Sequence, residues 1–126
     1  MYEVGVARTF EGAHQLEESP SADEDHEHNY RVEVVIRGEV LGEQGMLLDL
    51  DDLGAALDAC TRELESAQLE SLPAFEGQNT TVELVAQHVW DHVRELIGPP
   101  LHLESLRVTV LESADAWAAV DQVLSS

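Results

Sequence analysis

Two kinds of hydrophobic spacing run along this chain and predict its secondary structure. Apolar and polar residues alternate from Tyr2 to about His14, and they alternate again from about His28 to Val40. A period of two is typical of half-buried strands. Residues 15–25 between the two segments are rich in acids and predict a loop. We therefore expect a long antiparallel hairpin at the start of the chain.

The middle of the chain changes to helical spacing. Asp49 is expected to cap a first helix, which residues 71–77 end with their proline and glycine. The residues expected to face inward are Leu53, Ala56, Leu57, Cys60 and Leu64. Cys60 lies on this apolar stripe and nothing basic flanks it, so we interpret it as core filler and not as a nucleophile.

A second helix is predicted to start at the capping box Thr80-Thr81-Val82-Glu83 and to end before residues 98–100. The residues expected to face inward are Val82, Val85, Val89, Val93 and Leu96. His88 and His92 lie one helical turn apart, and we interpret them as an exposed helical face with adventitious metal affinity. For His102 the sequence indicates no partner.

Two further strands are predicted, from about Leu103 to Ser113 and from Ala116 to Val123. The order strand, strand, helix, helix, strand, strand predicts a single α+β domain over residues 1–126. Its four-stranded antiparallel sheet should carry both helices on one face. Such a sheet has exposed edges, which favours closure into a barrel built by several copies of the chain.

Charge limits the classes of partner. The chain has 26 acidic and 6 basic residues, no lysine among them, and a formal net charge of −20. Such a surface repels nucleic acid and anionic lipid, so neither is expected as a partner. No apolar run reaches the roughly twenty residues that a membrane span needs, and the start lacks a basic signal-peptide segment. We expect a soluble, cytoplasmic protein.

The candidate chemistry lies in the predicted hairpin. His26 and His28 are one residue apart in an extended segment and therefore point to the same face. His14 adds a third imidazole if its segment is the neighbouring strand. Three imidazoles with one open position are typical of a catalytic zinc site. The alternative is three unrelated surface histidines in an acidic loop, and the spacing favours the metal.

Further motifs extend this pattern in order along the chain. They are Phe10-x-x-Ala13-His14, His26-x-His28-Asn29-Tyr30, Gly45-Met46-x-x-Asp49, Asn79-x-Thr81-x-Glu83 and Leu111-Glu112. Together they resemble the 6-pyruvoyl-tetrahydropterin synthase and 6-carboxy-tetrahydropterin synthase family, whose bacterial members serve queuosine biosynthesis. The resemblance implies a tunnelling fold that assembles into trimers or hexamers, with a pterin at the subunit interface. It also implies zinc, Zn²⁺, held by His14, His26 and His28.

The resemblance also assigns residues to the pterin. Glu112 matches the family's anchor, a carboxylate that accepts hydrogen bonds from the amino group and ring nitrogen of the pterin. Thr81 lies beside it in the family pattern. The alternative is that Glu112 is only a solvated acid at the end of a strand. Its position in the motif favours the role in pterin binding.

The usual proton-transfer residues of the family are replaced. The position of its cysteine is Ala22, and in place of its Asp-His pair stand Glu65, which could serve as the acid, and Ser66. A side branch of the family resembles this chain in lacking the cysteine and uses a glutamate, whose position here is Asp23. Asp23 is either a substitute catalytic base or a solvated loop acid, and the neighbouring acids Glu24 and Asp25 are further candidates.

These residues lead to one functional hypothesis with two alternatives. The hypothesis is a zinc-dependent pterin lyase that acts on 7,8-dihydroneopterin triphosphate or a related pterin. The first alternative is a homologue that binds zinc and pterin without the standard synthase activity. The second is a related reaction on another pterin-like or purine-derived substrate, for which Ala22 and Ser66 leave room.

Overall fold

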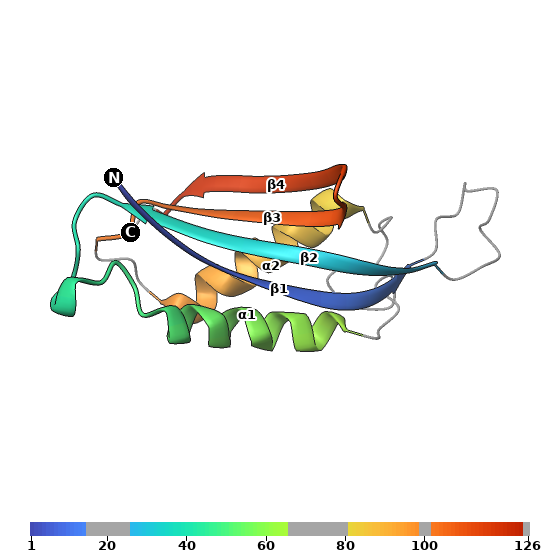
Figure 1. Ribbon diagram of the computed structural model, residues 1–126, viewed down its shortest axis with the longest axis horizontal. Coiled ribbons are helices and arrows are strands. Elements are labelled where there is room, and N and C mark those ends of the chain that lie inside the picture. The colour runs from blue at the N-terminus through green and yellow to red at the C-terminus, as the bar shows by residue number, and fades with distance from the viewer. Residues whose placement is uncertain (15–25, 66–80, 99–101, 125–126) are drawn as a thin grey trace.

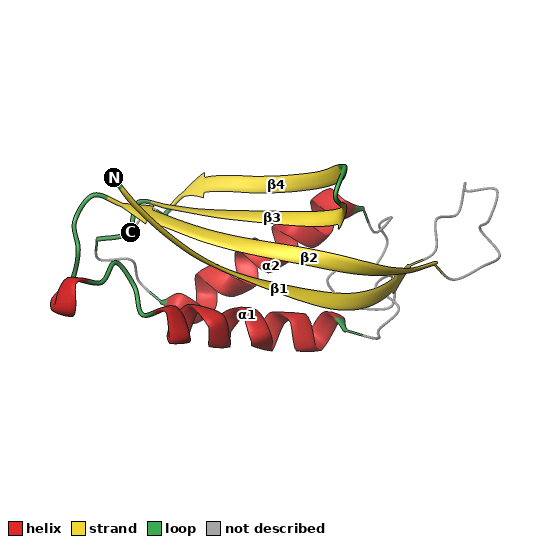
Figure 2. Cartoon of the chain, viewed as in Figure 1, coloured by secondary structure: helices red, strands yellow, loops and turns green. Residues whose placement is uncertain are grey.

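The computed structural model describes residues 1–14, 26–65, 81–98 and 102–124 and shows a sheet covered on one face by two helices (Figures 1 and 2). The strands are β1 (Tyr2–His14), β2 (His26–Gly38), β3 (Ser105–Ser113) and β4 (Ala116–Val123). The helices are α1 (Leu50–Leu64) and α2 (Val82–Ile97), with a short 3-10 turn, η1, at Glu43–Gly45. The predicted α+β fold is confirmed.

The sheet is antiparallel throughout, in the order β1-β2-β3-β4. The strand β2 pairs with β1 along its whole length, from Tyr2 opposite Gly38 to His14 opposite His26. Its pairing with β3 stops at Arg31, which lies opposite Leu111. The hairpin of β1 and β2 therefore extends beyond the end of β3, as Figure 1 shows.

Burial follows the expected periods. Alternate residues of β2, from Tyr30 to Ile36, are at most 1% exposed, and the same alternation continues into β3. These side chains pack against the inward stripes of both helices, because one face of the sheet is covered and the other is not. The predicted inward residues of α1 are all buried: Leu53, Ala56, Leu57, Cys60 and Leu64.

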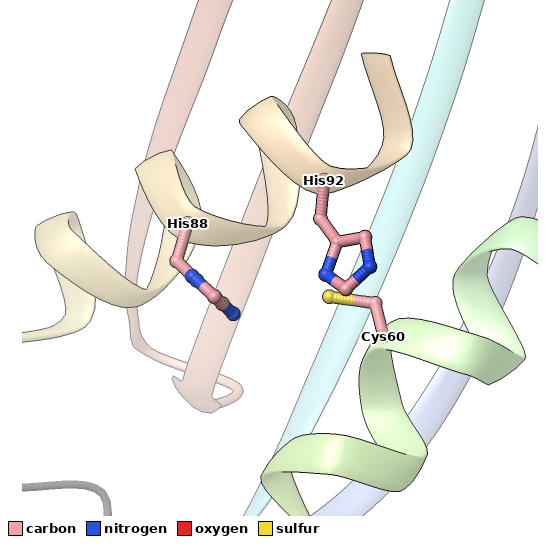
Figure 3. A group of neighbouring side chains, drawn as sticks. All are labelled: Cys60, His88 and His92. Carbon is pink, nitrogen blue, oxygen red and sulfur yellow. The ribbon is translucent and has the colours of Figure 1, made fainter. Parts of the chain in front are cut away.

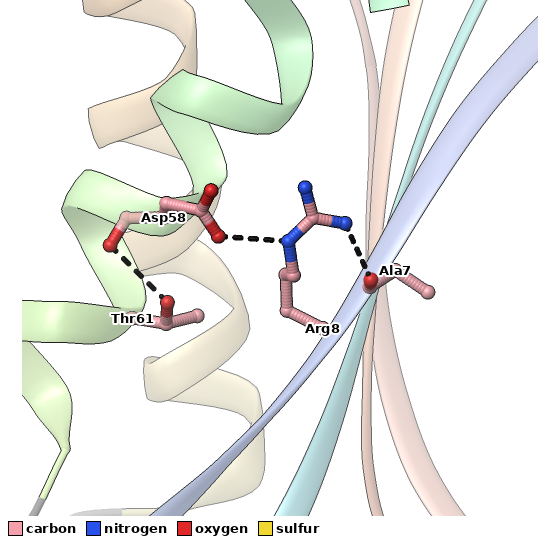
Figure 4. Close-up of polar contacts among 4 residues, drawn as sticks. All are labelled: Ala7, Arg8, Asp58 and Thr61. Carbon is pink, nitrogen blue, oxygen red and sulfur yellow. Dashed lines mark hydrogen bonds and ion pairs between the residues drawn. The ribbon is translucent and has the colours of Figure 1, made fainter. Parts of the chain in front are cut away.

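Specific polar contacts fix the helices to the sheet. The indole Nε1 of Trp90 in α2 donates a hydrogen bond to the carbonyl of Leu106 in β3 at 2.8 Å. On the other side, Arg8 of β1 donates through Nε to the carboxylate of Asp58 in α1 at 2.7 Å (Figure 4). Each helix is thus tied to a different strand.

The boundaries and caps correct three details of the sequence analysis. The strand β2 covers His26–Gly38 and not His28–Val40, because its start pairs with the end of β1. Thr81, not Thr80, caps α2, since its side chain accepts from the backbone N–H of Leu84 at 3.2 Å. Position N3 is therefore an apolar residue, and the predicted capping box does not form.

Two side-chain predictions were also wrong. Leu96 is 49% exposed, because the inward stripe of the last turn of α2 continues on Ile97, which packs against the core, and not on Leu96. His102 does have a partner: its Nε2 lies 2.7 Å from the carbonyl oxygen of Leu47. This contact links the segment before β3 to the segment before α1, a pairing that no local sequence pattern could indicate.

Candidate functional site

The projecting end of the β1–β2 hairpin carries the three histidines that the sequence singled out. His14 lies directly opposite His26, and His28 lies opposite Gly12. Directly opposed residues of paired strands belong to the same face, and so do residues two apart along one strand. The backbone register therefore assigns all three positions to one face of the hairpin.

The base of this hairpin is anchored in the core. Phe10 and Tyr30 are opposed in the register, their rings stack at a centroid distance of 5.1 Å, and they are 2% and 1% exposed. Strand alternation assigns the three histidine positions to the same face as this aromatic pair. The pair thus fixes the register from which the candidate metal site extends.

This register fits a zinc site built from three imidazoles. A catalytic zinc ion takes three protein ligands in this way and keeps a fourth position for water or substrate. A slip of one residue would send either His14 or the pair His26 and His28 to the opposite face. The observed pairing is the one that keeps all three positions together.

The other predicted residues that the structure describes lie at the same end of the molecule. Glu112 lies near the end of β3, at an irregularity in its pairing with β4. Thr81 caps the start of α2, and Glu65 caps the end of α1, where its N–H donates to the carbonyl of Thr61 at 2.8 Å. Figure 1 shows this end of β3 and these two helix ends on the side where the hairpin projects.

The replaced proton-transfer positions are mostly outside the described part of the chain. Asp23 and Ala22, with the neighbouring acids Glu24 and Asp25, fall between β1 and β2. Ser66 follows α1 directly and also lies outside the described residues. The role of Asp23 therefore stays a prediction from the sequence.

A cavity of about 500 Å³ lies at the opposite end of the sheet from the histidines. It is lined by the start of β1, including Tyr2 and Val4, and by the residues from Leu41 to Asp51 that lead into α1. No histidine or cysteine of the described residues lines it, so among them this cavity offers none of the nitrogen and sulfur ligands that zinc prefers. We therefore place the candidate site at the hairpin end.

The structure also brings together a second group of side chains, which the sequence analysis left separate. His88 and His92 of α2 face Cys60 and Glu63 of α1, as Figure 3 shows for three of them. The histidine side chains are only 16% and 28% exposed, so the prediction of an exposed helical face was wrong. The i, i+3 spacing of Cys60 and Glu63 is visible in the sequence and indicates that the two side chains lie on one face of α1. Only the packing of the two helices shows that this face lies against His88 and His92.

The fold and the hairpin site first define a class of protein. The architecture is the tunnelling fold, and the structure resembles that of Caenorhabditis elegans 6-pyruvoyl tetrahydropterin synthase with a TM-score of 0.81. That match has 22% identity and covers 96% of this chain and 95% of the other. The family model for 6-pyruvoyl tetrahydropterin synthase matches residues 3–123. The chain belongs to the 6-pyruvoyl tetrahydropterin synthase family.

Individual relatives differ in how much they share. Human 6-pyruvoyl tetrahydrobiopterin synthase is 32% identical over 74 residues, which is 57% of this chain and 51% of the human protein. The chain thus spans about half the length of the curated animal relatives it matches. A Plasmodium vivax 6-pyruvoyltetrahydropterin synthase, solved with its catalytic glutamate changed to cysteine, has a TM-score of 0.78 at 18% identity. That match covers 97% of this chain and 98% of the other.

Proposed function

We propose that this chain is a zinc-dependent pterin lyase of the tetrahydropterin synthase kind, with residues 1–126 forming one catalytic domain. Its substrate is 7,8-dihydroneopterin triphosphate or a related pterin. One observation carries the proposal: in a chain of this family, the hairpin register assigns His14, His26 and His28 to one face. We further propose a cytoplasmic location and, by resemblance to bacterial members, a place in queuosine biosynthesis.

The histidines and the pterin anchor would divide the work between them. His14, His26 and His28 would hold zinc, which supplies a Lewis acid for the hydroxyl groups of the pterin side chain. Glu112 would accept hydrogen bonds from the amino group and ring nitrogen of the pterin, with Thr81 beside it. The carboxylate thus fixes the orientation of the ring, so that its side chain is presented to the histidine end.

The catalytic base is proposed to be Asp23, with Glu65 as the second acid. Proton abstraction next to a hydroxyl-bearing carbon requires a base within hydrogen-bonding reach of that C–H bond. Asp23 occupies the loop position that corresponds by resemblance to a catalytic glutamate, and the Plasmodium vivax relative has a glutamate as its catalytic residue. Glu65 stands at the end of α1, where the resemblance puts the acid of the Asp-His pair.

We propose that several copies of the chain complete the site. The sheet has two edge strands, β1 and β4, and apolar side chains such as Trp117 on β4 are exposed, at 58% in this case. Unpaired edges and exposed apolar side chains favour association. A trimer or hexamer that closes the sheets into a barrel would cover both.

A second candidate function is a zinc- and pterin-binding homologue without synthase turnover. The replacement of the cysteine by Ala22 and of the histidine by Ser66 favours it, because both lie in the family's proton-transfer positions. A related reaction on another pterin-like substrate is the remaining alternative. The three candidates share the metal site. The first two share the pterin and differ in the chemistry that follows binding, whereas the third also differs in its substrate.

Turnover separates the first candidate from the others. Zinc-loaded protein is incubated with 7,8-dihydroneopterin triphosphate, and pterin products are followed by chromatography, with His28→Ala as the variant that lacks a complete metal site. We expect a new tetrahydropterin product that disappears in this variant. Asp23→Asn should lower kcat by at least about 100-fold, the usual contribution of a general base. Full activity of Asp23→Asn would exclude Asp23, and binding without product would favour the second candidate or a reaction on a substrate not yet tried.

A further inference from the structure

The contact between α1 and α2 brings together side chains that metals prefer. Cys60, His88 and His92 each offer one ligand atom, and these atoms all lie within 4.8 Å of one another. The carboxylate of Glu63 joins them, with one oxygen 3.3 Å from His88 Nε2 and the other 3.8 Å from His92 Nδ1. Two residues come from each helix, at spacings of three on α1 and four on α2, so each pair occupies one helix face.

The positions of these side chains form a small site that is closed at its base and open at its rim. Cys60 is fully buried, whereas the Glu63 side chain is 40% exposed. A shallow opening of about 240 Å³ leads to the group and is lined by Glu63, His88, Asp91, His92 and Glu95. A hydrated ion can therefore reach Glu63 and both histidines from solvent, and the Cys60 sulfur lies within 4.8 Å of the histidine ligand atoms.

The charge around this opening favours a cation. Asp91 and Glu95 lie on the same helix as the two histidines and add acidic groups to the rim. Asp91 is held by a hydrogen bond from Gln87 Nε2 at 2.9 Å. The opening thus combines one carboxylate among the ligands with two at the rim, and a divalent cation would be attracted by all three.

We propose that the group formed by Cys60, Glu63, His88 and His92 is a second metal site, which binds a divalent ion of the zinc class between α1 and α2. Thiolate, imidazole and carboxylate are the ligands that zinc takes in tetrahedral sites. The bound ion links the two helices and stabilises the fold. This site shares no residue with the hairpin site and does not depend on the proposed function.

The observed spacing is wider than in a loaded site. Ligand atoms around tetrahedral zinc are about 3.3–3.5 Å apart in a site with one sulfur, given bond lengths of about 2.0 Å to nitrogen and 2.3 Å to sulfur. Since the ligand atoms of Cys60, His88 and His92 lie within 4.8 Å of one another, the group contracts by no more than about 1.3 Å when the ion enters. Rotation of the side chains of His88, His92 and Glu63 supplies this contraction, since all three are partly exposed.

An ion-pair cluster beside a buried thiol is the alternative explanation. Burial, and then the nearby charge of Glu63, raise the pKa of Cys60 to about 12, so the metal-free protein carries a protonated thiol at neutral pH. A bound metal must displace this proton, as metals do when they bind cysteine. The two explanations therefore differ in one observable, a sulfur–metal bond.

Cobalt(II) is the probe that detects this bond. A thiolate ligand gives cobalt a charge-transfer absorption band in the near ultraviolet, which imidazole and carboxylate ligands do not give. The chain has one cysteine, so any such band reports Cys60. Metal-free protein is titrated with CoCl₂ at about pH 8 and the band is recorded against equivalents added. We expect the band to saturate after one equivalent of cobalt per chain has bound at this site. Cobalt bound by the hairpin histidines adds to the total uptake but gives no such band.

Four variants assign the site. His88→Gln combined with His92→Gln should abolish the band, and unchanged far-ultraviolet circular dichroism shows that this variant still folds. His28→Ala should keep the band, because it alters only the hairpin site. Glu63→Gln should weaken cobalt binding about tenfold more than Glu95→Gln, which removes an equal charge from the rim. No band in the folded wild type, or a band that survives in the double histidine variant, would overturn the proposal.

Discussion

At the scale of single residues, Cys60 has the most altered chemistry of the described part of the chain. Burial raises its pKa from 9.0 to about 12. Below pH 9 the thiol is protonated in both the folded and the unfolded chain, so its contribution to stability is complete. Between pH 9 and 12 only the unfolded chain loses the proton, and stability falls by about 1.4 kcal/mol per pH unit.

This pH dependence can be measured on metal-free protein by urea unfolding at several pH values from 8 to 11. The wild type should lose free energy of unfolding as the pH rises above 9, relative to Cys60→Ala. The variant itself is less stable at every pH because it leaves a small cavity, so the slope and not the offset is the result. Parallel curves for the two proteins would show that the thiol is not shielded from solvent.

The residue scale also shows where sequence patterns succeed. The inward residues of α1 were predicted because a stripe at spacings of three and four must face the core if the helix is to bury apolar surface. The same rule failed at Leu96, because a step of four from Val93 leads to Ile97, which packs against the core, and a step of three leads to the exposed Leu96. Periodicity indicates the face of a helix, but it does not decide which residue at the border of that face is buried.

At the scale of elements, the start of α1 depends on one side chain. Asp49 accepts a hydrogen bond from the backbone N–H of Asp51 at 2.8 Å and thereby caps the helix, as the sequence predicted. Asp49→Ala should lower the free energy of unfolding by about 1 kcal/mol, because a backbone donor loses its partner. Asp49→Ser should recover most of this loss. The measurement is chemical denaturation at neutral pH, and equal stability of the wild type and Asp49→Ala would contradict the assignment.

Elements also show what local patterns miss. The hairpin of β1 and β2 was predicted from alternation, and its register was anticipated only as far as bringing His14 near His26. The packing of α1 against α2 was not predicted, because the contact between Cys60 and the two histidines joins residues far apart in sequence. Each helix pattern indicates an inward face, but nothing in it indicates the angle or offset at which two helices pack.

At the scale of the whole molecule, charge is the dominant feature. With a formal net charge of −20 over 126 residues, the folded chain repels itself more strongly than the expanded unfolded chain does. At 0.1 M, salt largely screens the repulsion between exposed charges that are more than about 10 Å apart. We expect Tm to rise by several degrees between about 0.01 M and 0.3 M NaCl, as followed by circular dichroism. A Tm that falls over this range would indicate that attractive ion pairs such as Arg8–Asp58 outweigh the repulsion.

The sequence predicted the candidate site in part, and the limit has a physical cause. The three histidines could be proposed from their spacing in an extended segment, whereas Glu112 and Thr81 could be proposed only from the resemblance to a known family. The proposed catalytic base could not be assigned between Asp23 and its neighbours, because a run of adjacent acids has no period that singles out one of them. A site at a subunit interface, as proposed above, would add a second cause, since one chain's sequence does not indicate which surface of a partner it meets.

Pterin binding tests the central claim most directly, because the proposed lyase and the zinc- and pterin-binding alternative both require it. Zinc-loaded wild type is titrated with 7,8-dihydroneopterin by calorimetry under anaerobic conditions, beside Glu112→Gln and the matched control Glu104→Gln. Glu104 lies just before Ser105, where β3 begins, whereas Glu112 lies near the other end of the strand. The control variant therefore removes the same charge at a position away from the site.

We predict that Glu112→Gln binds the pterin about tenfold to hundredfold more weakly than the wild type, because the charge-assisted hydrogen bonds of the carboxylate are lost. Its zinc content and the affinity of Glu104→Gln should be unchanged. Equal affinity of Glu112→Gln and the wild type, or no binding of pterin by the zinc-loaded wild type, would contradict the account.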